Sequence, residues 1–236
     1  MSLLKDILYK VSLIATAGDM KIDINKIEFD SRLIRPGDLF VAIKGTQTDG
    51  HKYIHSAIEK GAMAIICDEM PEHRPANVTC VKVRNSAEAR GRIASNFYDN
   101  PSEKLKLVAV TGTNGKTTTV TILHQLFSNL GYNTGLISTV ENRIKGEVKK
   151  ASHTTPDALQ LNQLIREMIN SGCTHCFIEA SSHAIEQKRI SGLDIDIGVF
   201  TNITHDHLDY HGSFDAYIKA KKQLFDNLRK GATALT

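Results

Sequence analysis

The stretch Val110-Thr-Gly-Thr-Asn-Gly-Lys-Thr-Thr-Thr-Val120 is the most informative one for the fold of the second half of this chain. An apolar run over 105–110 precedes it and is typical of a buried strand, and apolar residues at helical spacing follow over 120–127. A strand, a glycine-containing loop and a helix that opens on Gly-Lys-Thr favour phosphate binding, because the N–H groups and the dipole at a helix start attract anions. The stretch therefore predicts a nucleotide-binding loop.

Two side chains of this loop have expected roles. Lys116 should reach the outer phosphates of the nucleotide, and the Thr117 hydroxyl should bind Mg²⁺. The full Walker pattern is not met, because its first glycine would fall on Val110, and Gly-Lys-Thr alone can be an ordinary helix start. The predicted nucleotide-binding residues are Gly112, Thr113, Asn114, Gly115, Lys116, Thr117 and Thr118.

The composition is that of an ordinary globular protein. Of the 236 residues, 41% are hydrophobic and 23% are charged. The net charge of +3 and the scattered basic residues argue against a nucleic-acid partner. No apolar stretch approaches the roughly 18 residues of a membrane span, and residues 4–11 predict an amphipathic helix, not a signal peptide. We expect a monomeric cytoplasmic protein without a disulfide framework and without nucleic-acid or membrane partners.

The predicted elements divide the chain near residue 101, where the polar, proline-containing segment 98–104 is typical of a hinge. Residues 1–101 predict a small α/β domain with strands at 39–43, 62–67 and 80–83 and helices at 53–60 and 86–98. Residues 102–236 alternate strands with helices, which predicts a mostly parallel sheet covered on both faces. The strands expected there are 105–110, 134–139, 175–180, 196–201 and 232–236, and the helices are 117–129, 157–171 and 214–229.

Two further places are candidates for a metal site. Glu179 ends an apolar strand at the rim that carries the loop, where it could bind Mg²⁺ in the manner of a Walker-B carboxylate or simply be a solvated acid. The segment 205–211 contains three histidines and two aspartates, and a metal role for it is as reasonable as a hydrogen-bonded polar loop. The sequence leaves both alternatives open.

The remaining polar groups are less specific. Spacing predicts that Lys219, Lys221 and Lys222 lie on the solvated face of a helix. The segment 153–157 predicts a helix start with its proline in the first turn, and with 181–189 it could hold a substrate. Arg189 there could bind a carboxylate or phosphate through two hydrogen bonds.

Six motifs, in this order, resemble those of the Mur ligases of bacterial cell-wall synthesis, and most of all the MurE type that adds the third residue of the peptide stem. Each motif is of moderate specificity, but six in register are highly specific. They are Asp30-Ser-Arg-x-x-x-Pro-Gly-Asp-Leu-Phe-Val-Ala, Gly45-x-x-x-Asp-Gly-His51, Thr111-Gly-Thr-Asn-Gly-Lys-Thr-Thr118, Thr154-Thr-Pro-Asp157, Glu179-Ala-Ser-Ser-His183 and Asp206-His-Leu-Asp-Tyr-His-Gly212.

The resemblance implies roles that spacing does not assign. It implies that the first domain binds the uridine end of the substrate, near Ser31, Thr46, Gln47 and Thr48. The positions that match contacts to the sugar-peptide part are His153, Thr154, Thr155, Ser181, Gln187 and Arg189. In the same way, Lys116 and Thr117 match residues that hold ATP and Mg²⁺, Glu179 and His207 match ligands of Mg²⁺, and Lys221 matches a lysine carried as its carbamate.

The implied reaction is an ATP-dependent ligation in two steps. The γ-phosphoryl group of ATP passes to the glutamyl carboxylate of UDP-MurNAc-L-Ala-D-Glu, and the amine of a diamino acid then displaces phosphate. The resemblance leaves open whether that diamino acid is meso-diaminopimelate or L-lysine, because family members have a third domain that is absent here. Residues 231–236 look like a strand just beginning, so we expect a fragment that is inactive alone.

Two other functions remain as alternatives to a ligase. One is a metal-dependent hydrolase built on His205, His207 and His211, in which the loop is only structural. The other is a module that binds a nucleotide or a UDP-sugar without catalysis.

Overall fold

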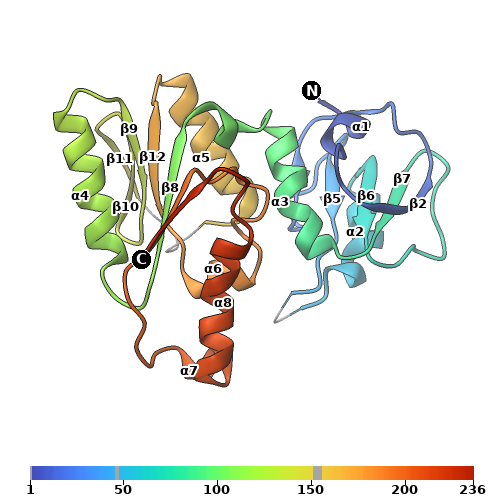
Figure 1. Ribbon diagram of the computed structural model, residues 1–236. Helices are drawn as coiled ribbons and strands as arrows, with labels where there is room; N and C mark the ends of the chain where they lie inside the picture. Colours follow the sequence, from blue (N-terminus) through green and yellow to red (C-terminus); the bar gives the residue numbers. More distant parts are fainter. Residues whose placement is uncertain (1, 46–47, 151–155) are drawn as a thin grey trace. The chain divides into compact units, whose positions relative to one another are not determined.

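The computed structural model describes residues 2–45, 48–150 and 156–236. The chain forms two compact units, Met1–Asp99 and Asn100–Thr236, which are described separately (Figure 1). Both residues at the division, Asp99 and Asn100, have left-handed backbones, with φ of 61° and 46°. Aspartate and asparagine tolerate this conformation better than most residues, and the short 3₁₀ helix η2 (Pro101–Lys104) follows directly.

The first unit is built on a five-stranded sheet in the order β2-β7-β6-β5-β4. Four of these strands are parallel and β2 is antiparallel to β7. The strands are β2 (Leu13–Ala17), β4 (Ile27–Glu28), β5 (Leu39–Val41), β6 (Ala64–Cys67) and β7 (Thr79–Val83), and β1 (Ser2–Leu3) pairs separately with β3 (Asp23–Ile24). The helices are α1 (Leu4–Ile7), η1 (Gly50–Tyr53), α2 (Ile54–Glu59) and α3 (Ser86–Phe97).

The N-terminal helix is shorter than the sequence predicts. The expected apolar face is present, because Leu4, Ile7 and Leu8 are buried. The helix nevertheless ends at Ile7, and Lys10 takes a left-handed backbone with φ of 59°. The prediction of a helix over 4–11 is therefore wrong beyond its first half.

The second unit contains a seven-stranded sheet in the order β11-β10-β9-β12-β8-β13-β14. Five strands are parallel: β8 (Lys106–Thr111), β9 (Thr134–Ile137), β12 (His175–Glu179), β13 (Ile197–Phe200) and β14 (Thr233–Leu235). The sequence did not predict the antiparallel hairpin of β10 (Glu141–Ile144) and β11 (Glu147–Lys150). The mostly parallel α/β fold is confirmed.

The helices of the second unit cover both faces of this sheet, as Figure 1 shows. Alternate residues of β8 point to opposite faces: Leu107 and Ala109 join the core with α5 (Ala158–Asn170) and α8 (Phe214–Asp226), whereas Val108 and Val110 pack with α4 (Lys116–Asn129). Two short helices, α6 (Ser182–Glu186) and α7 (Leu208–His211), were not predicted.

The start of α5 and the state of the cysteines were also predicted from the sequence. The α5 helix starts at Ala158 with a capping box formed by Asp157 and Gln160, so Pro156 lies before the cap and not in the first turn. All four cysteines are free and buried. Within the described ranges, no helix is long and apolar enough to cross a membrane.

The register of the central strands sets the position of the candidate site. Glu179, the last residue of β12, lies opposite Val110 of β8, and Phe200 at the end of β13 lies opposite Thr111. Three neighbouring parallel strands therefore end at one rim of the sheet. In such sheets ligands bind beyond the carboxyl ends of the strands.

Candidate active site

The loop between β8 and α4 depends on its two glycines. Gly112 has a φ of 153° and Gly115 a φ of 84°, which side chains with a Cβ rarely adopt. At Gly112 the space is also closed, because a Cβ would lie 1.9 Å from Thr201 Oγ1. Only glycine therefore allows the loop to pack this closely on the segment that follows β13.

We predict that Gly112→Ala lowers the free energy of unfolding by roughly 3 kcal/mol, from backbone strain together with the clash with Thr201. The matched control is Gly131→Ala, where φ is 91° and nothing lies within 4 Å of the added Cβ. That control should cost about 1 kcal/mol, from backbone strain alone. Urea denaturation measures both; equal losses would contradict the close packing on Thr201.

Residues after β13 hold the first half of the loop. The N–H of Thr113 donates to the Asn202 carbonyl at 2.9 Å, and the N–H of Asn114 donates to Asn202 Oδ1 at 3.0 Å. The Thr201 hydroxyl donates to the Asn114 carbonyl at 2.6 Å. The next residue, Gly115, is the N-cap of α4 and has no side chain with which to cap the helix N–H groups. The first turn of α4 is therefore open to an anion.

Two lysines converge on this loop. Lys116 Nζ donates to the carbonyls of Gly112 and Thr113 at 3.0 and 2.9 Å, and Lys221 Nζ of α8 donates to the Gly112 carbonyl at 2.6 Å. The Lys221 ammonium also lies 4.5 Å from the centre of the Tyr217 ring. Lys221 is buried and only 2% exposed, so its predicted place on a solvated face is wrong, although Lys219 and Lys222 are exposed.

Burial lowers the pKa of both lysines. Burial, and then the neighbouring Lys116, lower the pKa of Lys221 to about 7, against an opposing effect of Asp206. Burial also lowers the pKa of Lys116, while Glu179 and Asp206 act to raise it. Lys221 is therefore divided between its neutral and charged forms near pH 7.

Glu179 is fully buried at the end of β12. Its carboxylate accepts hydrogen bonds from Thr139, at 2.8 Å from the backbone N–H and at 2.9 Å from the hydroxyl. The alternative of a solvated acid is therefore wrong. The contact also holds both carboxylate oxygens beside the loop after β9, because hydrogen bonds from N–H and O–H to a carboxylate are strong.

Two of the three histidines of 205–211 share neighbours, because the rings of His207 and His211 both lie beside His183 and Tyr217. The His205 ring stacks on Phe214 at 4.3 Å, and the His207 ring lies 5.0 Å from the His183 ring. The His211 side chain is buried, with Nε2 at 3.0 Å from Ser182 Oγ. No group of three or more His, Cys, Asp or Glu side chains in the described part of the chain could hold a metal ion. These histidines therefore give no support to the alternative of a metal-dependent hydrolase.

Comparison with known proteins identifies the family. The model of the Mur ligase middle domain matches residues 110–236, and that of the Mur ligase family catalytic domain matches residues 23–98. The chain belongs to the Mur ligase family. The resemblance stated from the motifs is confirmed.

Two similar relatives carry the name UDP-N-acetylmuramoyl-L-alanyl-D-glutamate--2,6-diaminopimelate ligase. The protein from Cytophaga hutchinsonii is 58% identical over 98% of this chain and 48% of its own length, and that from Bacteroides thetaiotaomicron is 50% identical over 99% and 48%. A solved structure of a ligase of this name has a TM-score of 0.76 and 30% identity, over 95% of this chain and 45% of its own. The chain thus spans about half the length of the relatives it matches.

A more distant structure shows the fold alone. MurF from Acinetobacter baumannii has a TM-score of 0.64 at 19% identity, covering 98% of this chain and 48% of that chain. The arrangement of β8, α4 and their neighbours is therefore that of Mur ligase structures.

In this member of the Mur ligase family the predicted substrate residues are only partly brought together. Gln187 Oε1 accepts from Arg189 Nε and Nη2 at 3.0 and 2.7 Å, and Gln187 Nε2 donates to the Tyr210 hydroxyl at 3.1 Å. Ser181 caps α6. Ser31, which is buried, and Thr48, which is exposed, lie in the first unit. Five predicted residues fall outside the described part of the chain: Thr46, Gln47, His153, Thr154 and Thr155.

Sequence reasoning missed several residues that support the loop. Thr113 Oγ1 lies 3.1 Å from the Tyr217 hydroxyl and accepts from the Thr204 N–H at 3.0 Å. Thr139 and Asn202 were not predicted either. Their position in the sequence could have indicated a role at the site, because each follows a parallel strand at the rim where β8 ends.

Proposed function

We propose that this chain is the substrate-binding and ATP-binding part of a ligase that adds 2,6-diaminopimelate to UDP-MurNAc-L-Ala-D-Glu. The observation that carries the proposal is the convergence of Lys116 and Lys221 on the Gly112 carbonyl, beside a helix start without a cap. The relatives' names supply the substrates, including the diamino acid that the motifs left open.

The proposed nucleotide site uses the loop and the first turn of α4. The open N–H groups of that turn and the Lys116 ammonium are suited to the phosphates of ATP, since both favour negative charge. The ammonium now engages loop carbonyls and would exchange them for phosphate oxygens. The residues assigned to ATP are Gly112, Thr113, Asn114, Gly115, Lys116, Thr117 and Thr118.

The residues near this loop fit Mg²⁺, which prefers oxygen ligands. Glu179 offers a buried carboxylate that Thr139 holds, and Thr117 offers a hydroxyl at the start of α4. Lys221 would add oxygens as its carbamate, and His207 would add a ring nitrogen. When bound, Mg²⁺ would neutralise phosphate charge during transfer.

A carbamate on Lys221 is supported by the burial of its amine. Only a neutral amine attacks CO₂; a C–N bond forms and the nitrogen loses a proton, which leaves an anion. Because burial and Lys116 lower the pKa of Lys221 to about 7, the neutral form is abundant near neutral pH. The product anion would also attract Lys116 where the ammonium repels it.

We predict that the chain equilibrated with ¹³C-labelled CO₂ near pH 8 shows one slowly exchanging carbamate signal in its ¹³C NMR spectrum. The signal should be lost in Lys221→Met and kept in Lys219→Met, a change at an exposed lysine of the same helix. Carbamate signals that are unchanged in Lys221→Met would remove this role.

In the proposed reaction the protein mainly positions and neutralises charge. The glutamyl carboxylate oxygen attacks the γ-phosphorus and ADP leaves; the amine of diaminopimelate then attacks the acyl carbon and phosphate leaves. Lys116 would hold the phosphate oxygens in line during the first step. Arg189, held by Gln187, would hold the carboxylate-bearing substrate.

The two units would divide these tasks. We assign the uridine end of the substrate to residues 1–101, at Ser31, Thr46, Gln47 and Thr48, and ATP to residues 102–236. The sugar-peptide part is assigned to His153, Thr154, Thr155, Ser181, Gln187 and Arg189. A cytoplasmic location suits this proposal, because ATP is a substrate.

The test uses both the chain and its full-length parent protein. The 236-residue chain should bind Mg-ATP without turnover. The parent should convert UDP-MurNAc-L-Ala-D-Glu with ATP and 2,6-diaminopimelate, and should use L-lysine poorly. Tight ATP binding by a parent that ligates neither amino acid would instead favour a non-catalytic binding module.

A further inference from the structure

Tyr210 links the short helix α7 to the segment that the proposed function assigns to the sugar-peptide part of the substrate. Its hydroxyl accepts from Gln187 Nε2 at 3.1 Å, although the two residues lie 23 apart in the sequence. Gln187 Oε1 in turn accepts from Arg189 Nε and Nη2 at 3.0 and 2.7 Å. The three side chains therefore form one hydrogen-bonded chain that ends on the guanidinium.

The polarity of these hydrogen bonds fixes the orientation of the Gln187 amide. A guanidinium group only donates, so the amide oxygen must face Arg189 and the amide nitrogen must point the other way. Tyr210 supplies the acceptor on that other side. Without this acceptor, rotation of the amide would cost no hydrogen bond at the nitrogen, and Gln187 would hold the guanidinium less firmly.

Tyr210 is itself held in place by aromatic neighbours. The centre of its ring lies 4.0 Å from that of His183 and 4.9 Å from that of His211. His211 Nε2 lies 3.0 Å from Ser182 Oγ, which ties α7 to α6. The glutamine and arginine that Tyr210 orders are long side chains, which lose rotamer freedom when they are fixed. A held tyrosine hydroxyl is therefore a suitable anchor for them.

The backbone turns so that Arg189 can reach Gln187. Lys188, between them, has a left-handed backbone with φ of 57°. The N–H of Arg189 donates to the Ala184 carbonyl at 2.9 Å, and Lys188 Nζ donates to Gln223 Oε1 of α8 at 2.8 Å. Because these contacts fix the backbone of the turn, the remaining freedom is in the side chains, where the contact with Tyr210 acts.

We propose that Tyr210 is a positioning residue for the carboxylate-bearing substrate and acts through Gln187 on Arg189. The inference rests on the proposed function, since it takes Arg189 as the group that binds the carboxylate. A guanidinium binds a carboxylate best when its plane is aligned for two parallel hydrogen bonds. A guanidinium that is already oriented loses less conformational entropy on binding, so Tyr210 contributes to substrate affinity.

The first test is steady-state kinetics of the full-length parent protein. Tyr210→Phe keeps the ring and removes the acceptor, so it should raise KM for UDP-MurNAc-L-Ala-D-Glu roughly fivefold, the effect of one net hydrogen bond. KM for ATP should change little, because this hydrogen-bonded chain includes no residue of the nucleotide loop. In an Arg189→Ala background, Tyr210→Phe should have no further effect, since Tyr210 acts through Arg189.

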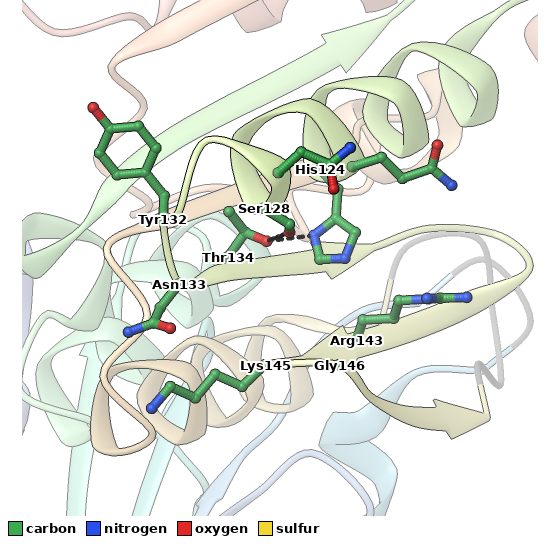
Figure 2. Close-up of a pocket in the computed structure, with 10 residues that line it drawn as sticks. His124, Ser128, Tyr132, Asn133, Thr134, Arg143, Lys145 and Gly146 are labelled. Carbon is green, nitrogen blue, oxygen red and sulfur yellow. Dashed lines mark hydrogen bonds between the residues drawn. The ribbon is translucent and has the colours of Figure 1, made fainter.

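Tyr132→Phe is the matched control, because it removes the same atom from another tyrosine of the same unit. Tyr132 is exposed, and Figure 2 shows its hydroxyl pointing away from the other labelled residues of a pocket around His124. Both KM values of this variant should equal those of the natural protein.

The second test needs no ligase activity and uses the 236-residue chain. The Arg189 Nε–H donates to Gln187, so its ¹⁵N NMR signal, assigned by its loss in Arg189→Lys, should exchange slowly with water. The exchange should be severalfold faster in Tyr210→Phe and unchanged in Tyr132→Phe.

Three outcomes would overturn the proposal: an unchanged KM for UDP-MurNAc-L-Ala-D-Glu in Tyr210→Phe, the same rise in that KM with and without Arg189, or unchanged exchange of the Arg189 Nε–H in Tyr210→Phe. The variants also separate this failure from that of the proposed function. If Arg189→Ala itself leaves that KM unchanged, the assignment of the substrate to Arg189 fails and this inference fails with it. If Arg189→Ala raises that KM and Tyr210→Phe does not, only the role of Tyr210 is removed.

Discussion

Lys116→Ala is expected to lower ligation by the full-length protein by roughly 10²–10³-fold, while the free energy of unfolding changes little. The Lys116 side chain lies at the uncapped start of α4, where its ammonium donates to two loop carbonyls. When ATP is bound, its main contribution should be the positive charge that it places beside the phosphates. A second effect adds to the first. Lys116 helps to lower the pKa of Lys221, so its removal should raise that pKa and disfavour the carbamate.

Steady-state kinetics with UDP-MurNAc-L-Ala-D-Glu and 2,6-diaminopimelate measures this loss, and urea denaturation of the 236-residue chain measures the folding. Lys219→Ala, which removes an exposed lysine from α8, is the control for a change in net charge. Unchanged turnover in Lys116→Ala would remove the nucleotide site from this loop.

The parallel strands could be predicted because burial on both faces produces short continuous apolar runs. The runs before Gly112 and before Ala180 correspond to β8 and β12. The hairpin β10–β11 could not be found in the same way. Its strands, Glu-Asn-Arg-Ile and Glu-Val-Lys-Lys, are mostly polar, and its turn is Lys145-Gly146, whose lysine adopts a positive φ that sequence alone does not reveal. The helices α6 and α7 are shorter than two turns and leave no periodic pattern.

The site was only partly predictable for a different reason. The loop and Glu179 follow from strand-end position, which is local in sequence. The burial of Lys221 depends on how α8 packs against Gly112, a contact 109 residues away. The sequence nevertheless contains a pattern that indicates the burial of Lys221. Tyr217, Lys221 and Leu224 are spaced at i, i+4 and i+7 and are all buried, so Lys221 lies on the apolar stripe of its helix.

Lys221→Met is expected to stabilise the 236-residue chain near neutral pH and to lose this advantage in alkali. The folded chain holds Lys221 at a pKa of about 7, against an ordinary 10.5. Between these values the unfolded chain binds a proton that the folded chain does not, so the stability of the natural chain rises with pH there. Below about pH 7 the full burial penalty is present, about 5 kcal/mol as an upper bound at 1.36 kcal/mol for each unit of pKa.

Methionine keeps most of the length of the side chain and carries no charge, so the variant lacks this penalty at every pH. Urea denaturation in CO₂-free buffer should therefore show a gain of several kcal/mol at pH 6.5 that shrinks steadily toward pH 10. The Gly112 carbonyl keeps the hydrogen bond from Lys116, so the substitution does not leave it unpaired. Lys219→Met in the exposed part of α8 should show no such dependence. A difference between Lys221→Met and the natural chain that stays constant from pH 6.5 to 10 would mean that Lys221 keeps an ordinary pKa, and the carbamate proposal would lose its physical basis.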